Sequence, residues 1–317
     1  MINFVGRKQW FFLASWLLVI MGVVALIVSQ VRLGSPLLLG TDFTGGTSVV
    51  FQFSPPVQQS QLRSEMAKLG FEEATIQNAG QGSFVIHTRA ITSAEAKTLA
   101  DELGADLNSQ VEVTDFYLAS PSVGAATARS ATIAVIVAAI AMLFYIVWAF
   151  RRMPNPFRWG TAAIIALVHD VFIVVGIFAL LGLVAGVQVD ALFITGLLTV
   201  VGYSINNTVV VFDRIRENRA RGLSSDFAVT VNSSIVETLG RCLNTSLTTL
   251  FVILALFLFG GATIHYFILV LLLGVLIGLY DSVCIVGELL VVWEKREWRA
   301  LIPWPRRSAQ PELSNNL

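Results

Sequence analysis

Long apolar runs dominate the pattern of hydrophobic and polar positions along this chain. Each run reaches about the 20 residues that cross the hydrocarbon core of a bilayer, so each predicts a transmembrane helix. Six such helices are expected, at about 10–28, 128–150, 160–184, 189–212, 239–259 and 264–292. The links at 185–188 and 260–263 are so short that the helices on either side are expected to form hairpins.

The first apolar run has a secretory signal peptide as its rival interpretation. The run is longer than the apolar core of a typical signal peptide, and no small-residue cleavage site follows it. It is therefore predicted to be a retained transmembrane helix.

The polar segment at 30–123 has the pattern of a small folded domain. Stretches rich in β-branched and aromatic residues predict strands at 48–53, 73–78, 83–88 and 111–117. Amphipathic stretches predict helices at 57–69 and from Ser93 to Gly104. The order β-α-β-β-α-β is that of a ferredoxin-like domain.

The expected fold class is thus an α-helical polytopic membrane protein with six transmembrane helices and an extracytoplasmic α+β ferredoxin-like domain between the first two. The expected parts are a tip and first helix (1–29), the ferredoxin-like domain (30–123), the bundle of the other five helices (124–293) and a tail (294–317). The tail from Trp304 onward is predicted to be disordered.

Composition agrees with a membrane protein. The 317 residues are 55% hydrophobic and 13% charged, which excludes an ordinary soluble domain. The net charge is zero, so nothing indicates a nucleic-acid partner. Cys242 and Cys284 both lie in apolar runs and have no metal-ligand spacing, so neither a disulfide nor a metal site is expected.

The distribution of Lys and Arg predicts the orientation. Basic residues occur in the N-terminal tip, in the loops near 151–158 and 214–221 and in the tail, which all lie on one side of a six-helix arrangement. The two short loops opposite carry none, and the folded segment is acidic. By the positive-inside rule both termini are expected in the cytoplasm, with the folded domain outside, which in a bacterium is the periplasm.

Ionisable side chains inside the predicted helices are few and costly to bury. They are His169, Asp170, Arg241, Asp281 and Glu288. Helical spacing suggests a polar track of Asp170, Asn207 and Arg241 that carries an ion or proton. Further polar side chains that support such a track are His169, Ser204, Asn206, Thr245 and Thr248.

The alternative for the small polar side chains is that they join helices through hydrogen bonds, each worth roughly 0.6–2 kcal/mol. An enzyme is not expected. Tyr280-Asp281 suggests an intramembrane aspartyl protease, but the second carboxylate motif that such chemistry needs is absent. His169-Asp170 suggests a metal phosphohydrolase, but no other His lies near it in sequence.

Several motifs together resemble the SecF family, whose members partner SecD in the bacterial SecDF protein-export complex. They are Gly40-Thr-Asp42-Phe43-Thr-Gly45-Gly46-Thr47, His169-Asp170, the stretch from Gly202 to Asn218 that contains Asp213-Arg214, and Arg241. The resemblance covers about residues 1–297. It implies structural roles for Gly40, Asp42, Phe43, Gly45, Gly46, Asp213 and Arg214.

The resemblance also implies a function. A chain of this kind resembles half of a resistance-nodulation-division transporter and pairs with a SecD-like chain in the lipid bilayer of the bacterial inner membrane. The pair would assist the SecYEG channel, the SecA motor and YajC-like accessory subunits, and would use the proton-motive force to promote preprotein translocation. No cofactor is implied beyond the coupling ion, which is a proton or, in some organisms, sodium.

Asn207 departs from the family pattern, which has an Asp at this position that carries protons and faces the arginine matched by Arg241. Asn has nearly the same shape but cannot titrate, so proton coupling is expected to be impaired. Either an engineered substitution fixes one protonation state, or the natural relay runs elsewhere, through Asp170. The alternatives for function are half of a small-molecule or lipid transporter of the same superfamily, and a purely structural scaffold.

Overall fold

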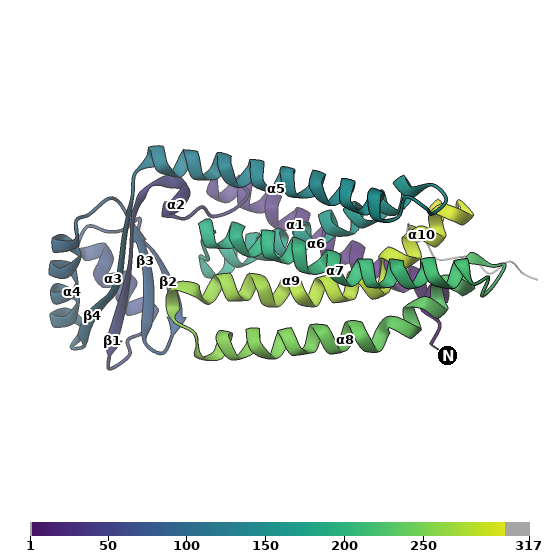
Figure 1. Ribbon diagram of the computed structural model, residues 1–317. Helices are drawn as coiled ribbons and strands as arrows, with labels where there is room; N and C mark the ends of the chain where they lie inside the picture. Colours follow the sequence, from purple (N-terminus) through teal and green to yellow (C-terminus); the bar gives the residue numbers. More distant parts are fainter. Residues whose placement is uncertain (1, 302–317) are drawn as a thin grey trace, which may run out of the picture.

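The apolar runs form long helices that lie along one axis, with a sheet domain across one end (Figure 1). The computed structural model describes residues 2–301, so the stretch predicted to be disordered lies outside the described residues. Six spans in the described part are long and apolar enough to cross a membrane, as predicted. Their helices are α1 (Lys8–Leu33), α5 (Pro121–Ala149), α6 (Pro156–Ala185), α7 (Ala191–Ala220), α8 (Phe227–Phe259), and α9 (His265–Cys284) followed by α10 (Val286–Lys295).

Helices α7 and α8 extend beyond the apolar runs that predicted them. Helix α7 continues through its charged end to Ala220, and α8 begins at Phe227 rather than near residue 239. The side chain of Asp226 accepts a hydrogen bond from the backbone N–H of Ala228 (3.0 Å) and caps α8 at that point. Hydropathy detects only the part of a helix that lies in an apolar environment, so it missed these polar extensions.

The sequence predicted one continuous helix for the last membrane span, but the structure divides this span into two helices. Its backbone breaks at Ile285, where φ is −123° and ψ is −55°, and α10 follows at a different angle (Figure 1). Two residues later, a Cβ at Gly287 would lie 2.9 Å from Cδ1 of Ile235, so α10 packs closely on α8 there. A break of this kind leaves hydropathy unchanged and is therefore invisible in the apolar pattern.

The sheet domain has the predicted order of elements. They are β1 (Gly46–Ser54), α3 (Gln59–Lys68), β2 (Thr75–Gly80), β3 (Ser83–Thr88), α4 (Ser93–Leu107) and β4 (Gln110–Ala119). The strand order is β2-β3-β1-β4 with all neighbours antiparallel, as in a ferredoxin-like domain. Helices α3 and α4 cover the face away from the bundle (Figure 1), and Phe51, Phe53, Phe84, Leu62 and Leu103 are fully buried between the layers.

The segment around the short helix α2 (Thr41–Thr44) joins the sheet domain to the bundle. The N–H of Gly40 donates to the carbonyl of Val189 (2.8 Å), and the N–H of Ala191 donates to Oδ2 of Asp42 (2.9 Å). A Cβ at Gly124 would lie 2.6 Å from the carbonyl oxygen of Phe43, so α5 begins directly against this segment. Gly46 has φ +118°, a conformation that favours glycine. The sheet domain is thus joined to α5 and α7 through short backbone contacts.

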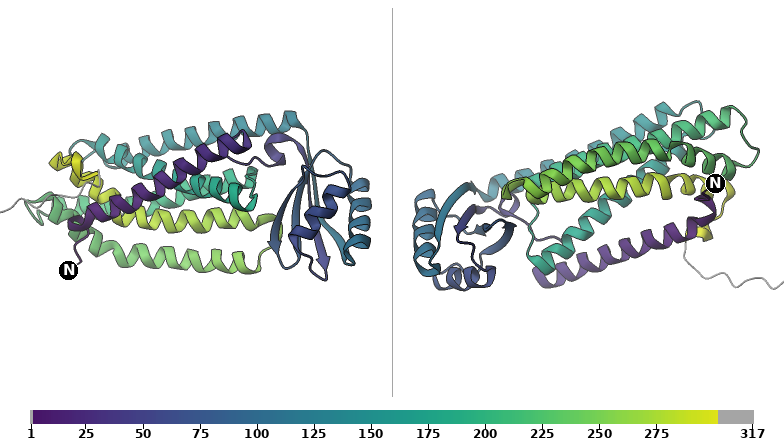
Figure 2. Two further views of the ribbon diagram at one scale, coloured as in Figure 1. Left: turned by 180° about the vertical axis from the view of Figure 1, so that it is seen from behind. Right: turned by 90° about the horizontal axis from the view of Figure 1, so that it is seen from below.

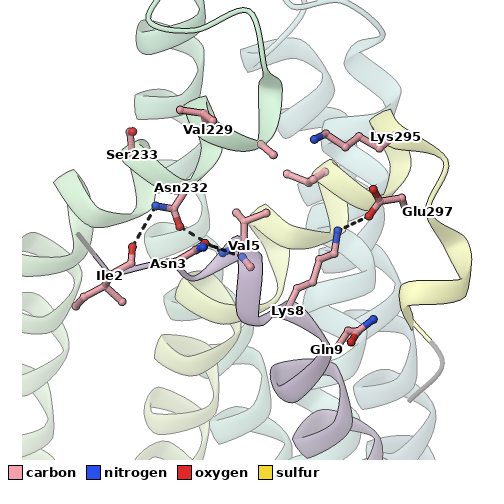
Figure 3. A pocket seen from close by; sticks show the side chains of 13 residues that line it. Ile2, Asn3, Val5, Lys8, Gln9, Val229, Asn232, Ser233, Lys295 and Glu297 are labelled. Carbon is pink, nitrogen blue, oxygen red and sulfur yellow. Dashed lines mark hydrogen bonds and ion pairs between the residues drawn. The ribbon is translucent and has the colours of Figure 1, made fainter. Parts of the chain in front are cut away.

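At the other end of the bundle, the start of the chain packs against α8 and α10. Oδ1 of Asn232 accepts hydrogen bonds from the backbone N–H groups of Phe4 (2.8 Å) and Val5 (3.3 Å). Lys8 forms an ion pair with Glu297. Val5, Lys8, Asn232 and Glu297 are among the residues that line a recess of about 640 Å³ (Figure 3). The N-terminal turn (Val5–Arg7) is therefore held in place by two elements from the second half of the chain.

Candidate functional site

Five polar side chains from four helices meet inside the bundle. They are Ser15 of α1, His169 and Asp170 of α6, Ser204 of α7 and Asp281 of α9, and we refer to them as the His169 cluster. Nδ1 of His169 lies 3.3 Å from Oδ1 of Asp170 and 3.4 Å from Oδ1 of Asp281. The Oγ of Ser204 donates to Oδ2 of Asp170 (2.5 Å), and Nε2 of His169 is hydrogen-bonded to Ser15.

Small residues bring these helices close enough to form the cluster. A Cβ at Gly278 of α9 would lie 3.0 Å from Cβ of Ser204, and a Cβ at Gly274 would lie 2.1 Å from Val200. Thr208 and Ser282 share a hydrogen bond of 3.2 Å one turn further along the same crossing. Glycine lets two helix backbones approach closely in a membrane, so α7 and α9 can bring polar groups into contact.

The carboxylates in this part of the bundle are deeply buried. Asp170 is 1% exposed and Asp281 is not exposed at all. Within residues 2–301, neither oxygen of Asp281 has a hydrogen-bond partner, and the 3.4 Å contact with His169 lacks hydrogen-bond geometry. Glu288, after the helix break, is also fully buried, and neither of its oxygens has a hydrogen-bond partner in the described part of the chain. Such groups need a neutralising charge or a proton, because an isolated carboxylate is costly in an apolar interior.

Asn207 lies outside the His169 cluster, at the contact between α7 and α8. It is 2% exposed, and its Nδ2 donates to Oγ of Ser246 on α8 (3.1 Å). Ser204, three residues earlier, faces Asp170 on α6 instead. Among the described residues, Asn207 makes no hydrogen bond to Asp170 or Arg241, and Arg241 lies elsewhere on α8, so the structure separates the three residues of the predicted polar track.

Arg241 faces outward on α8. It is exposed, and within residues 2–301 its guanidinium makes no hydrogen bond or ion pair. The other exposed polar residues of this region are Asn206 of α7 and Asn244, Thr245 and Thr248 of α8. In the part of the chain that the structure describes, the hydroxyls of Thr245 and Thr248 donate only to carbonyls of their own helix.

Two glycines add to this outward surface. A Cβ at Gly202 or at Gly240 would meet nothing within 4 Å. Tyr203 reaches the same edge of α8, where its hydroxyl donates to the carbonyl of Thr245 (3.2 Å). We call the set Gly202, Asn206, Gly240, Arg241, Asn244, Thr245 and Thr248 the open polar face.

The charged end of α7 is attached to the start of α8. Arg214 pairs with Glu237 and with Glu217, and Nδ2 of Asn218 donates to Glu237 (2.9 Å) and to Ser234 (3.0 Å). Asp213 is exposed and pairs with Arg216 on its own helix (2.5 Å). The motif therefore fixes the angle between α7 and α8, which also sets the contact of Asn207 with Ser246.

A cavity of about 430 Å³ lies between the sheet and the ends of α7 and α9. His87, Asp42 and Asp190 line it. Burial lowers the pKa of His87 to about 4. The pKa of Asp190 is raised, first by burial and then by the Asp42 carboxylate, although the N–H of Phe193 donates to its side chain (2.8 Å).

Sequence reasoning named His169, Asp170 and Ser204 but did not join them to Asp281 or Ser15. The sequence did indicate a functional role for Asp281, because a carboxylate in an apolar run is costly to bury and marks a functional position. Ser15 carried no such signal, since a lone serine in a transmembrane helix is common. Helix α1 crosses over α6 (Figure 2), and this crossing brings the Ser15 hydroxyl within hydrogen-bond distance of His169.

Comparison with known families identifies two matching models. Residues 100–296 match "Protein export membrane protein SecD/SecF, C-terminal", and residues 33–57 match the "SecD/SecF GG Motif". The second match includes the segment that joins the sheet domain to α5 and α7.

Known relatives are similar in sequence to this chain over almost its whole length. The protein translocase subunit SecF of Thermobaculum terrenum is 40% identical over 99% of both chains. The protein translocase subunit SecDF of Bacillus subtilis is 31% identical over 93% of this chain and 38% of its own length.

The fold matches a solved structure as well. The crystal structure of SecDF from Thermus thermophilus, described as a translocon-associated membrane protein, has a TM-score of 0.79 at 33% identity, over 93% of this chain and 39% of that one. Both relatives are named as protein translocase subunits. The chain therefore belongs to the SecD/SecF family of protein-export membrane proteins.

Proposed function

We propose that this chain pairs with a SecD-like chain and uses the proton-motive force to promote preprotein translocation across a bacterial inner membrane. In this assignment both termini are cytoplasmic and the sheet domain lies outside. The pair acts beside the SecYEG channel, the SecA motor and YajC-like subunits, with protons, or sodium in some organisms, as the coupling ion and no other cofactor. The support is the SecF and SecDF relatives, in which SecDF carries the matching part within a longer chain.

The observation that carries the proposal is the open polar face. Arg241 lies near the start of the apolar run 239–259, where an exposed guanidinium needs a countercharge or access to the membrane interface. It has no partner among the residues that the structure describes, and a second protein can supply one. Gly202 and Gly240 let that protein approach both backbones. A SecD-like chain with a carboxylate at this depth would satisfy Arg241.

Helix α5 supports the same conclusion for a larger surface. It packs on α6 but leaves most of its side chains outside the bundle. Its large exposed apolar residues are Ile133, Ile136, Val137, Ile140, Phe144, Tyr145 and Trp148. Lipid and a partner helix can both cover such a surface, whereas a partner with a carboxylate would also neutralise Arg241.

The residue at position 207 determines how strongly translocation by the pair is coupled to proton movement. It is buried one helix contact away from the open polar face, beside Ser246. An Asp there would gain and lose a proton as the neighbouring charge changes, whereas Asn keeps the neutral form at every pH. We therefore propose that coupling is weak in this chain and that Asn207→Asp restores it.

The test uses the chain co-purified with its SecD-like partner and reconstituted in vesicles with a defined proton gradient. Proton flux and export of a preprotein are measured for the wild type, Asn207→Asp and Asn207→Asp combined with Arg241→Gln. We expect at least tenfold faster flux for Asn207→Asp and loss of that gain in the double variant.

Asn155→Asp is the matched control, because it makes the same change in the exposed loop between α5 and α6, outside the open polar face. It should leave flux near the wild-type value. Equal flux in the wild type and in Asn207→Asp would refute the coupling proposal. Failure to co-purify with any SecD-like chain would refute the proposed pairing.

A further inference from the structure

We propose that the His169 cluster binds a divalent cation of the zinc class inside the bundle. The ligands are Nδ1 of His169 and one carboxylate oxygen each of Asp170 and Asp281. This site is separate from the open polar face and does not depend on proton coupling. It adds a binding function to a chain whose sequence had suggested no metal.

The distances suit such an ion. Ligands of tetrahedral zinc lie about 2.0–2.1 Å from the metal, which places neighbouring ligand atoms about 3.3–3.4 Å apart. Nδ1 of His169 is 3.3 Å from Oδ1 of Asp170 and 3.4 Å from Oδ1 of Asp281, and all three ligand atoms lie within 4.8 Å of one another. One position of the tetrahedron stays open for a water or another ligand.

The surrounding hydroxyls orient the ligands. Metal-binding histidines use their second ring nitrogen as a donor to a nearby oxygen, which fixes the ring and leaves the other nitrogen free for the metal. Here Ser15 lies on Nε2, so Nδ1 faces the two carboxylates. The Oγ of Ser204 donates to Oδ2 of Asp170, which leaves Oδ1 turned toward His169.

Asp281 is the observation that points to a ligand. It is completely buried, it is directed at His169, and neither of its oxygens has a hydrogen-bond partner among the described residues. Three polar groups thus converge with more acceptor atoms than donors. A cation at their centre would satisfy Nδ1 and one oxygen of each carboxylate at the same time.

The charge of the cluster favours a divalent ion. Within the described chain, no Lys or Arg forms an ion pair with Asp170 or Asp281, so two carboxylates share a low-dielectric interior. An ion of charge +2 neutralises both, whereas sodium would neutralise one. Imidazole nitrogen together with carboxylate oxygen also suits zinc-class ions better than alkali ions. Glu288 of α10 lies beyond the helix break and is not part of this ligand set.

The experiment uses the full chain in lipid nanodiscs after removal of metals with a chelator. Co²⁺ is added as the probe, because in a tetrahedral site it gives visible absorption bands that Zn²⁺ then removes. We expect one Co²⁺ per chain in the wild type. Asp281→Asn and His169→Gln should each weaken binding at least tenfold, and Ser15→Ala about tenfold through loss of ring orientation.

Matched controls exist within the chain. His87→Gln and His265→Gln test the other two histidines, and Glu288→Gln tests a buried carboxylate outside the ligand set. All three should bind Co²⁺ as the wild type does. Asp281→Asn should melt no lower than the metal-free wild type, because it removes an unpartnered charge. Ser15→Ala alters only the hydroxyl beside the ring and provides the test if the other variants fail to purify.

Absence of tetrahedral Co²⁺ bands in the wild type would overturn the proposal and leave protons as the groups that neutralise the cluster. Binding that survives Asp281→Asn, or that is lost in His265→Gln, would also overturn it. None of these measurements needs a partner, a gradient or export. Their outcome is therefore independent of the test of proton coupling.

Discussion

Gly22 of α1 and Gly176 of α6 are in direct backbone contact. A Cβ at Gly176 would lie 2.5 Å from Cα of Gly22, closer than any real Cβ contact, and a Cβ at Gly22 would lie 3.3 Å from Gly176. The crossing of α1 over α6 is visible in Figure 2. It is also what brings Ser15 of α1 within reach of His169.

Gly176→Ala should therefore separate α1 from α6. The added methyl group meets backbone atoms that cannot rotate away, and overpacking of this kind costs about 1–3 kcal/mol. We expect a lower thermal midpoint for the chain in detergent and faster proteolysis of α1. Gly202→Ala is the control, because its methyl group would enter open space. An unchanged midpoint for Gly176→Ala would contradict the close crossing.

Asp42→Ala should loosen the joint between the sheet domain and α7. The N–H of Ala191 would lose its carboxylate acceptor, and a hydrogen bond to a charged group is worth about 1.5–3 kcal/mol. The measurement is amide hydrogen exchange, which should become faster at Ala191 and through residues 40–47. Asp101→Asn, on the exposed side of α4, is the control and should leave exchange at Ala191 as it was.

The same substitution should change the titration of Asp190. The Asp42 carboxylate contributes to the raised pKa of Asp190, so its removal should lower that pKa. Carboxyl titration followed by infrared spectroscopy in Asp42→Ala would detect this change. A pKa of Asp190 that stays the same would show that burial alone sets it.

The lowered pKa of His87 predicts that the stability of the sheet domain depends on pH. An unfolded histidine titrates near pH 6.5, whereas burial lowers the pKa of His87 to about 4 in the folded domain. Between these values the unfolded state binds more protons, so stability falls as the pH falls from about 6.5 to about 4, by roughly 3–3.5 kcal/mol in total. Above this window the histidine is neutral in both states and has no effect.

Hydrogen exchange of the β3 amides, corrected for the intrinsic effect of pH on exchange, measures this loss. His87→Gln should remove the dependence, while His265→Gln on α9 should retain it. A sheet domain with equal protection at pH 4 and pH 6.5 in the wild type would contradict a half-buried His87 with a lowered pKa.

Much of the fold follows from the sequence for simple physical reasons. Apolar runs long enough to cross a bilayer have few alternatives to helices, and alternating strands with glycine turns define the sheet domain. The ends of the helices were harder to predict, because the polar start of α8 and the polar end of α7 lie outside the apolar pattern. The break at Ile285 depends on packing against α8, which no local pattern contains.

The candidate site was only partly predictable. Helical spacing placed Ser204 and Asn207 on one side of α7, and both are buried. It could not tell that Ser204 faces α6 while Asn207 faces α8, because one turn of helix can contact two neighbours. Nor could it place Asp281 beside His169, since that contact depends on which helices adjoin in the bundle.

The joint between the sheet domain and the bundle has a mechanical consequence. Backbone hydrogen bonds link residues 38–40 to Val189, directly before α7, and Asp42 holds its first N–H. No flexible linker separates the two parts at this point, so the sheet domain and α7 form a rigid lever. Any tilt of α7 within the membrane would swing the whole sheet, with the largest displacement at the far ends of α3 and α4.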